Sequence, residues 1–142
     1  MASVQAKIHT EEDYYNLPEN VRAVYPAPFA VKLKADKKTI VEPDISVIYD
    51  PTKLTDQGCT GAPDWIIEII SPGNSSHDYI RKLNLYADAG VREYWIVDPD
   101  RKSVFVYYLE ESNFKVDTHS FRDKIKVNIY EDLYIDFASL DL

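Results

Sequence analysis

Hydrophobic and polar residues alternate with a period of two over long parts of the chain, which is typical of β-strands. β-Branched and aromatic residues dominate residues 25–33 and again residues 39–49. The polar stretch 34–38 between them predicts a hairpin loop. Upstream, Thr10 followed by acidic residues has the pattern of a helix start, and Pro18 ends this short segment.

A nearly continuous apolar run at residues 64–71 predicts a central strand. Side chains on a strand point alternately to its two faces, so Trp65, Ile67 and Ile69 share one face and the even-numbered residues share the other. Both faces are apolar, as expected for a strand that is covered above and below. Glu68 is the one charged residue within the segment 65–70.

The next part of the chain predicts a crossover between two parallel strands. Residues 76–89 have a helical pattern, with Ile80, Leu83 and Ala87 as the core stripe. Residues 92–98 are again strand-like. A strand, a helix and a strand thus follow one another at βαβ spacing, for which a right-handed parallel connection is expected.

The remaining patterns complete a mixed sheet. Residues 103–109 and 114–121 predict a hairpin, and residues 125–137 predict one further short strand. The expected fold class is therefore α/β or α+β, with a mixed central sheet and helices on at least one face. The length of 142 residues, without repeats or low-complexity segments, favours a single domain over residues 1–142.

Composition and charge narrow the functional classes. A hydrophobic share of 45% with 28% charged residues is ordinary for a globular protein, and no apolar run reaches the roughly 20 residues of a membrane span. The single cysteine, Cys59, fits a reducing compartment, so we expect a cytoplasmic protein without a membrane partner. The net charge of −8 disfavours binding of phosphate backbones through a broad basic face. Chemistry on a nucleic acid would therefore need a bound cation.

Two carboxylates stand where the pattern predicts core strands. Glu68 lies in an apolar strand, and an isolated buried carboxylate costs several kcal/mol unless it is paired, protonated or bound to a cation. Asp44 starts the preceding strand and shares a face with Ser46 and Ile48. Because sequential strands are neighbours in about two cases of three, the two carboxylates can share one coordination sphere. Two hard oxygen ligands indicate a Mg²⁺ site completed by water and a substrate phosphate.

Lys82 supplies a candidate third group. It lies in line with Tyr79 and Tyr86, three and four residues away, on the edge of the helix stripe that faces the sheet. Its ammonium group can extend over the strand ends toward the two carboxylates. There it would orient a water nucleophile or stabilise a phosphoryl oxyanion.

Each of these residues also has a purely structural interpretation. Asp44 follows a proline, where an aspartate commonly starts a strand or forms a turn. Glu68 can form a buried ion pair with Lys82 or Arg81. Lys82 can instead pair on the helix surface with Asp78, four residues away. Surface positions are expected for the histidines, which lack the spacing of metal ligands: His9, His77 and His119.

Four blocks of the sequence together form a more specific pattern. They are EPDISV at residues 42–47, GAPDWIIEIISP at 61–72, DYIRK at 78–82 and AGVREYWIVDP at 89–99. These blocks closely resemble the Uma-two family, whose members are restriction-endonuclease-like proteins of the PD-(D/E)XK nuclease superfamily. The resemblance covers most of residues 24–137.

The resemblance implies a fold and a site. It implies a restriction-endonuclease-like mixed central sheet with flanking helices, and a Mg²⁺- or Mn²⁺-dependent nuclease core in which Asp44 and Glu68 bind the metal. The lysine of the superfamily usually stands two residues after the glutamate, where this chain has Ile70. In this family the lysine is on the helix, which here implies Lys82.

The chain departs from the family pattern near its N-terminal part. Relatives usually continue, after the segment that resembles residues 10–22, with a Glu-Leu-Ile-Asp-Gly stretch, a hairpin and a long helix. Here the sequence passes from Arg22 through Ala23 directly to Val24, so the domain is interpreted as abbreviated at this point. Either an acidic residue of the segment 11–13 replaces the carboxylate that the missing part supplies, or the site is incomplete. A shortened core also exposes apolar sheet surface, which favours a homodimer.

Two functional hypotheses follow. The first is a metal-dependent endonuclease that hydrolyses phosphodiester bonds in nucleic acid, with DNA as the expected substrate. Asp44, Glu68 and Lys82 are its catalytic residues, and Mg²⁺ or Mn²⁺ is its cofactor. The alternative is a catalytically inactive family member that serves as an oligomeric binding or structural module.

Overall fold

A computed structural model describes most of the chain. The described residues are 5–7, 22–33, 39–71, 76–110 and 114–140. The helix expected to start at Thr10, the acidic segment 11–13 and the expected hairpin loop 34–38 lie outside them. Among the described helices, none is long and apolar enough to cross a membrane.

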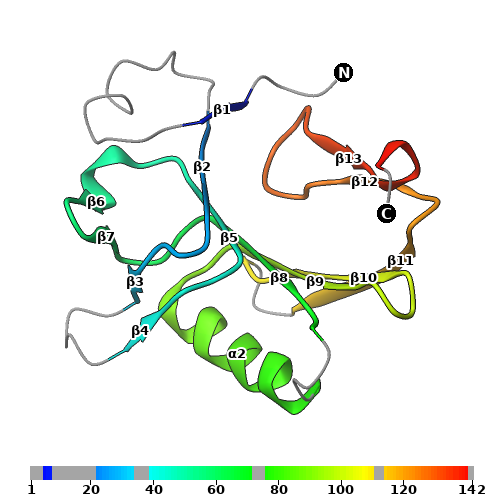
Figure 1. Ribbon diagram of the computed structural model, residues 1–142, viewed down its shortest axis with the longest axis horizontal. Helices are drawn as coiled ribbons and strands as arrows, with labels where there is room; N and C mark the ends of the chain where they lie inside the picture. Colours follow the sequence, from blue (N-terminus) through cyan, green and yellow to red (C-terminus); the bar gives the residue numbers. More distant parts are fainter. Residues whose placement is uncertain (1–4, 8–21, 34–38, 72–75, 111–113, 141–142) are drawn as a thin grey trace.

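The largest described sheet is mixed, as the sequence predicts. Its strands are β1 (Gln5–Lys7), β2 (Arg22–Pro26), β5 (Ile45–Ile48), β8 (Trp65–Ile69), β9 (Glu93–Asp98), β10 (Ser103–Tyr108) and β11 (Lys115–Ser120). They lie in the order β1-β2-β5-β8-β9-β10-β11 (Figure 1). The pairs β1–β2 and β8–β9 are parallel and the other neighbours are antiparallel. Helix α2 (Ser76–Ala89) connects β8 to β9, which confirms the expected strand–helix–strand unit.

Two small sheets flank the large one. The first contains β4 (Ile40–Val41), β3 (Val31–Lys32), β7 (Gly58–Thr60) and β6 (Leu54–Thr55), in that order. The second pairs β12 (Lys124–Lys126) with β13 (Tyr134–Asp136), where the sequence predicts a single strand. Two short 3₁₀ helices, η1 (Pro51–Lys53) and η2 (Phe137–Ser139), complete the described elements.

The strands predicted over residues 25–33 and 39–49 are each divided in two, which corrects the expectation of one simple hairpin. The first predicted strand becomes β2 and β3, and the second becomes β4 and β5. β2 pairs with β5 in the large sheet, and β3 pairs with β4 in a small one. Prolines at Pro26, Pro28 and Pro43 mark the breaks, because proline has no backbone N–H to donate to a strand ladder.

Two apolar clusters lie on opposite faces of the large sheet. Helix α2 covers one face, and the C-terminal segment with β12 and β13 covers the other (Figure 1). The central strand divides as its alternation predicts: Trp65 belongs to the C-terminal cluster, whereas Ile66 belongs to the α2 cluster. The predicted central position of β8 is confirmed, since β5 and β9 flank it.

The buried stripe of α2 differs from the predicted one. Ile80 is 48% exposed, whereas the side chains buried against the sheet are Tyr79 and Tyr86. Leu83 and Ala87 are partly buried against the same cluster, as expected. The tyrosine rings have more apolar surface to bury than an isoleucine, and their hydroxyl groups find hydrogen-bond partners on or beside the sheet.

Candidate metal and nucleic-acid site

The pairing of β5 with β8 brings the two predicted carboxylates together. These strands are antiparallel, with Ile45 opposite Ile67, so Asp44 and Glu68 extend the same register by one position. The backbone N–H of Asp44 donates to Glu68 Oε1 at 2.9 Å, and the backbone N–H of Ile69 donates to Asp44 Oδ2 at 2.7 Å. Each carboxylate therefore accepts a hydrogen bond from the backbone of the chain segment that carries, or directly follows, the other carboxylate.

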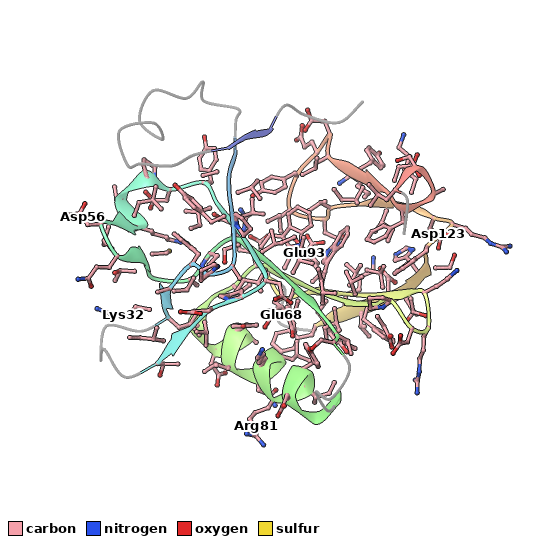
Figure 2. All side chains as sticks on the ribbon, viewed as in Figure 1. Lys32, Asp56, Glu68, Arg81, Glu93 and Asp123 are labelled. Carbon is pink, nitrogen blue, oxygen red and sulfur yellow. The ribbon has the colours of Figure 1, made fainter. Side chains whose placement is uncertain are left out.

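Helix α2 supplies two further donors to Glu68. This residue is only 2% exposed, and Figure 2 shows it on the side of the sheet that α2 covers. Lys82 Nζ lies 2.7 Å from Glu68 Oε2, and the Tyr86 hydroxyl donates to the same oxygen at 3.2 Å. Glu68 thus directs Oε2 toward the helix and Oε1 toward Asp44.

Two tyrosines of α2, Tyr79 and Tyr86, donate hydrogen bonds at this site. Burial, followed by the nearby charge of Glu68, raises the pKa of Tyr86 well above its ordinary value. The phenol therefore keeps its proton and donates a hydrogen bond to Glu68. About two turns earlier, the Tyr79 hydroxyl donates to the backbone oxygen of Ile69 at 3.2 Å, and Lys82 Nζ lies 5.4 Å from the centre of the Tyr79 ring. Three side chains of one helix stripe thus face residues 68 and 69.

These groups border an open cavity of about 490 Å³. Asp44, Glu68 and Lys82 line it, together with Glu42. The side chain of Lys82 lies at the cavity wall and is also accessible to solvent, since 39% of it is exposed. Carboxylate oxygens around a solvent-filled space are the donor set that Mg²⁺ uses in proteins.

The donor set fits a divalent cation with few protein ligands. Glu68 Oε1 and Asp44 Oδ2 each accept one backbone N–H, and a carboxylate oxygen has room for a second partner. Within the described ranges, no group of three or more His, Cys, Asp or Glu residues is placed to hold a metal ion. A cation at this site would therefore depend on two carboxylates, which suffices for Mg²⁺ when water and phosphate fill the other positions.

The structural interpretations of the same residues have mixed outcomes. The Lys82 ammonium group pairs with Glu68, as one structural alternative for this glutamate predicted. It does not pair with Asp78, which was the alternative for Lys82. His119 is paired at the surface with Asp123, at 3.6 Å. The side chains of His9 and His77 lie outside the described part of the chain.

Sequence reasoning missed the roles of two tyrosines. The spacing of Tyr79, Lys82 and Tyr86 placed them on one helix stripe, but their hydroxyl groups were not identified as donors to the site. The signal that could have found them was the coincidence of this stripe with a buried carboxylate on the preceding strand. Glu42 was likewise missed as a lining residue, although strand alternation places it on the same face as Asp44, two residues later.

Comparison with known proteins identifies the family. The model of the family Uma2, described as "Putative restriction endonuclease", matches residues 2–136. A solved structure, described as "a putative nuclease belonging to DUF820 from Anabaena variabilis ATCC 29413", is similar in fold, with a TM-score of 0.65 and 23% sequence identity over 86% of this chain and 70% of that chain. The chain has no match among curated proteins. Since the family match covers nearly the whole sequence and the fold agrees with it, the chain belongs to the Uma2 family of restriction-endonuclease-like proteins.

Proposed function

We propose that the chain is an endonuclease that requires a divalent metal and hydrolyses phosphodiester bonds in nucleic acid, with DNA as its substrate. One observation carries the proposal: the carboxylates of Asp44 and Glu68 and the ammonium group of Lys82 meet at one open cavity. Asp44 directly precedes β5, Glu68 lies in β8 and Lys82 lies in α2. Membership of a nuclease family supports the same chemistry.

Asp44 and Glu68 would hold the cation, for which we propose Mg²⁺ or Mn²⁺. Both are hard cations that prefer oxygen ligands. When bound, such a cation supplies a water molecule of lowered pKa and neutralises charge on the scissile phosphate. The backbone N–H groups of Asp44 and Ile69 fix the two carboxylates, so the ligand oxygens are already oriented before a cation arrives.

Lys82 would act on the phosphate. Its ammonium group has three N–H donors, of which one is directed to Glu68. The remaining donors can bind a phosphoryl oxygen in the cavity and stabilise the negative charge that develops there during hydrolysis. Tyr86 has a positioning role in this scheme, because its hydroxyl group holds Glu68 Oε2 on the helix side.

A cleavage assay tests the proposal. Plasmid and oligonucleotide DNA are incubated with the wild-type chain and millimolar Mg²⁺ or Mn²⁺, beside Asp44→Asn, Glu68→Gln and Lys82→Ala. We expect each substitution to lower the cleavage rate about 100-fold or more. Asp117→Asn is the matched control, since it removes one carboxylate from a strand at the sheet edge. Wild-type protein that cuts nothing with either ion, or Asp44→Asn and Glu68→Gln variants that cut as well as wild type, would refute it.

A second candidate function is that of a catalytically inactive family member acting as an oligomeric module. An apolar groove of about 320 Å³ on the sheet face opposite α2 favours it. Trp65, Val97 and Phe137 line this groove, and Ile69 and Leu140 at its border are 41% and 47% exposed. We propose a homodimer in which a second copy covers the groove, because apolar surface of this kind commonly marks an interface.

Two measurements separate the candidates. The first is calorimetric titration with Mg²⁺ or Mn²⁺. Binding to the wild type that is lost in Asp44→Asn favours the enzyme, whereas no heat of binding with either ion favours the module. Sedimentation velocity tests the dimer with two matched substitutions of exposed aliphatic residues, Leu140→Glu in the groove and Ile40→Glu on β4. We expect a wild-type dimer that only Leu140→Glu dissociates, and a monomeric wild type would contradict the interface.

A further inference from the structure

Another cavity, of about 350 Å³, adjoins the candidate metal site on the face of the sheet that α2 covers. Tyr79 lines both cavities. Ile69 borders the metal-site cavity and Ile70, the next residue of the chain, borders the other. A ligand bound at Asp44 and Glu68 could therefore extend into this second space, which is large enough for an aromatic ring system.

The walls of this cavity combine flat apolar surfaces with a few polar groups. Tyr79, Ile96 and Phe105 supply ring and aliphatic surface. The polar atoms come from Asp98, Asp100, Arg101 and Tyr107. Asp98 is 8% exposed, and the hydroxyl group of Tyr107 has a raised pKa because burial disfavours its ionised form. Asp98 is therefore buried, and Tyr107 is half-buried in the cavity wall.

The carboxylate of Asp98 has capacity to accept further hydrogen bonds. Its Oδ1 accepts the backbone N–H of Arg101 at 3.2 Å. Its Oδ2 lies 4.0 Å from Arg101 Nε, beyond hydrogen-bond distance, and the Arg101 side chain is 82% exposed. An ionised carboxylate only accepts hydrogen bonds, so a ligand that meets Asp98 must present N–H or O–H groups.

The charge of the chain independently points to contacts with bases. Most proteins that bind nucleic acid gain their affinity from lysine and arginine contacts to phosphates. This chain has 16 Lys and Arg against 24 Asp and Glu, so its mean field repels a phosphate backbone. Binding energy must then come from elsewhere, and stacking of bases on aromatic side chains is the alternative that single-strand binding proteins use.

We infer that this cavity binds one nucleobase that carries an exocyclic amino group, namely cytosine, adenine or guanine, next to the phosphodiester bond held at Asp44 and Glu68. The inference rests on the proposed nuclease function and specifies its substrate. The exocyclic amino group donates to Asp98. Among the pyrimidines, cytosine carries this group at the ring position where thymine and uracil carry a carbonyl oxygen, which the carboxylate repels. A base in the cavity that Tyr79 and Phe105 line has left its duplex, so the substrate is a single-stranded or locally unpaired nucleic acid.

Equilibrium binding without metal tests the inference independently of catalysis. Fluorescence anisotropy is measured with the full chain in EDTA, at one fixed salt concentration, on short single-stranded oligomers of deoxycytidine or of thymidine. We expect the cytosine oligomer to bind about fivefold or more tightly than the thymine oligomer. Asp98→Asn should abolish this preference, because an amide both donates and accepts hydrogen bonds. Phe105→Leu, which removes the ring but keeps apolar volume, should weaken the binding of both oligomers about fivefold.

Asp117→Asn is the matched control for the loss of one negative charge. Asp117 is opposite Val106 in the β10–β11 ladder, and Val106 packs in the cluster on the other face of the sheet. This variant should keep the wild-type preference. Equal binding of the two oligomers, no measurable binding of either, or the same preference in Asp98→Asn and Asp117→Asn would overturn the base site.

The cleavage assay distinguishes this failure from a failure of the nuclease proposal. Binding that depends on Asp98, without cleavage in Mn²⁺, keeps the base site and refutes the endonuclease. Cleavage by a protein that shows no base preference keeps the endonuclease and refutes the base site. Circular dichroism of each variant identifies any that fails to fold, and Asp98→Asn is nearly the same size and shape as the residue it replaces.

Discussion

Glu93 connects the large sheet to the C-terminal segment, and replacing it with glutamine is predicted to destabilise the protein. The side chain is fully buried, on the sheet face opposite Glu68 (Figure 2). Its Oε2 accepts from Trp95 Nε1 at 2.7 Å and from the backbone N–H and Nδ2 of Asn128 at 3.2 and 3.1 Å. Its Oε1 accepts the backbone N–H of Ile129 at 3.0 Å. One carboxylate thus satisfies four donors.

The expected loss follows from counting acceptors. Glutamine has one oxygen, and if that oxygen takes the Oε2 position it keeps three of the four hydrogen bonds. Its amide nitrogen then faces the N–H of Ile129, which leaves a buried donor without an acceptor at a cost of about 1–3 kcal/mol. We therefore expect Glu93→Gln to lower the free energy of unfolding by about 1–3 kcal/mol. Glu93→Ala, which removes all four acceptors, should cost more.

The loss should also depend on pH in a defined direction. Burial raises the pKa of Glu93 above its ordinary value of 4.5, although the donors from Trp95, Asn128 and Ile129 act in the opposite sense. A group whose pKa is higher in the folded state stabilises that state fully below the unfolded pKa, and this contribution is lost as the pH rises through the folded pKa. Glutamine does not titrate, so the deficit of Glu93→Gln should be largest in acid and smaller at neutral pH.

Urea unfolding followed by circular dichroism and tryptophan fluorescence, from about pH 4 to about pH 8, measures both effects. Thermal melts should show a decrease in Tm of roughly 2–12 °C, at about 2–4 °C per kcal/mol for a chain of this size. Glu131→Gln is an exposed control that should change stability by less than about 0.5 kcal/mol. A Glu93→Gln variant as stable as this control, or a deficit that grows as the pH rises, would refute the reasoning.

Three further substitutions or treatments test the packing. Tyr86→Phe removes one donor to the glutamate of the candidate site and should lower the free energy of unfolding by about 1.5 kcal/mol in chemical denaturation. Gly58→Ala places a Cβ atom 2.1 Å from the backbone oxygen of Ala30 and should lower the free energy of unfolding by about 1–3 kcal/mol. The Cβ atom of Gly90→Ala meets no atom within 4 Å, so this variant should lose less stability. Equal losses in the two variants would contradict this account. Burial raises the pKa of the Cys59 thiol to about 11, so iodoacetamide at mildly alkaline pH should modify it only after unfolding, and rapid labelling of the native protein would show the thiol to be accessible.

The parts of the fold that could be predicted are those with a local signal. The alternation around Trp65 is a property of five consecutive residues, and it gave the central strand and both of its faces. The helix was predicted at Ser76–Ala89, which are its observed ends, because the pattern and the following Gly90 lie next to one another in the sequence. Asp44 and Glu68 could be brought together from the same information, since neighbouring strands in the sequence usually pair.

The parts that could not be predicted depend on distant partners. The donors to Glu93 from Asn128 and Ile129 lie 35 and 36 residues further along the chain, so nothing near Glu93 distinguishes it from an exposed strand residue. The division of the first two predicted strands is similar in kind. Prolines mark where a ladder stops, but which half pairs with which is decided only by the completed sheet.

The orientation of α2 about its own axis connects the folding of the domain to the geometry of the candidate site. A helix that buried Ile80 in its core stripe, as the apolar pattern predicted, would be turned by about one residue, or roughly 100°. That orientation would bury more aliphatic surface but would turn Lys82 away from the sheet. Glu68 would then be a buried carboxylate without a cation, at a cost of several kcal/mol that one exposed isoleucine cannot offset. The charge on β8 therefore selects the orientation of the helix, and the same orientation brings Lys82 and Tyr86 within hydrogen-bond distance of Glu68 at the candidate site.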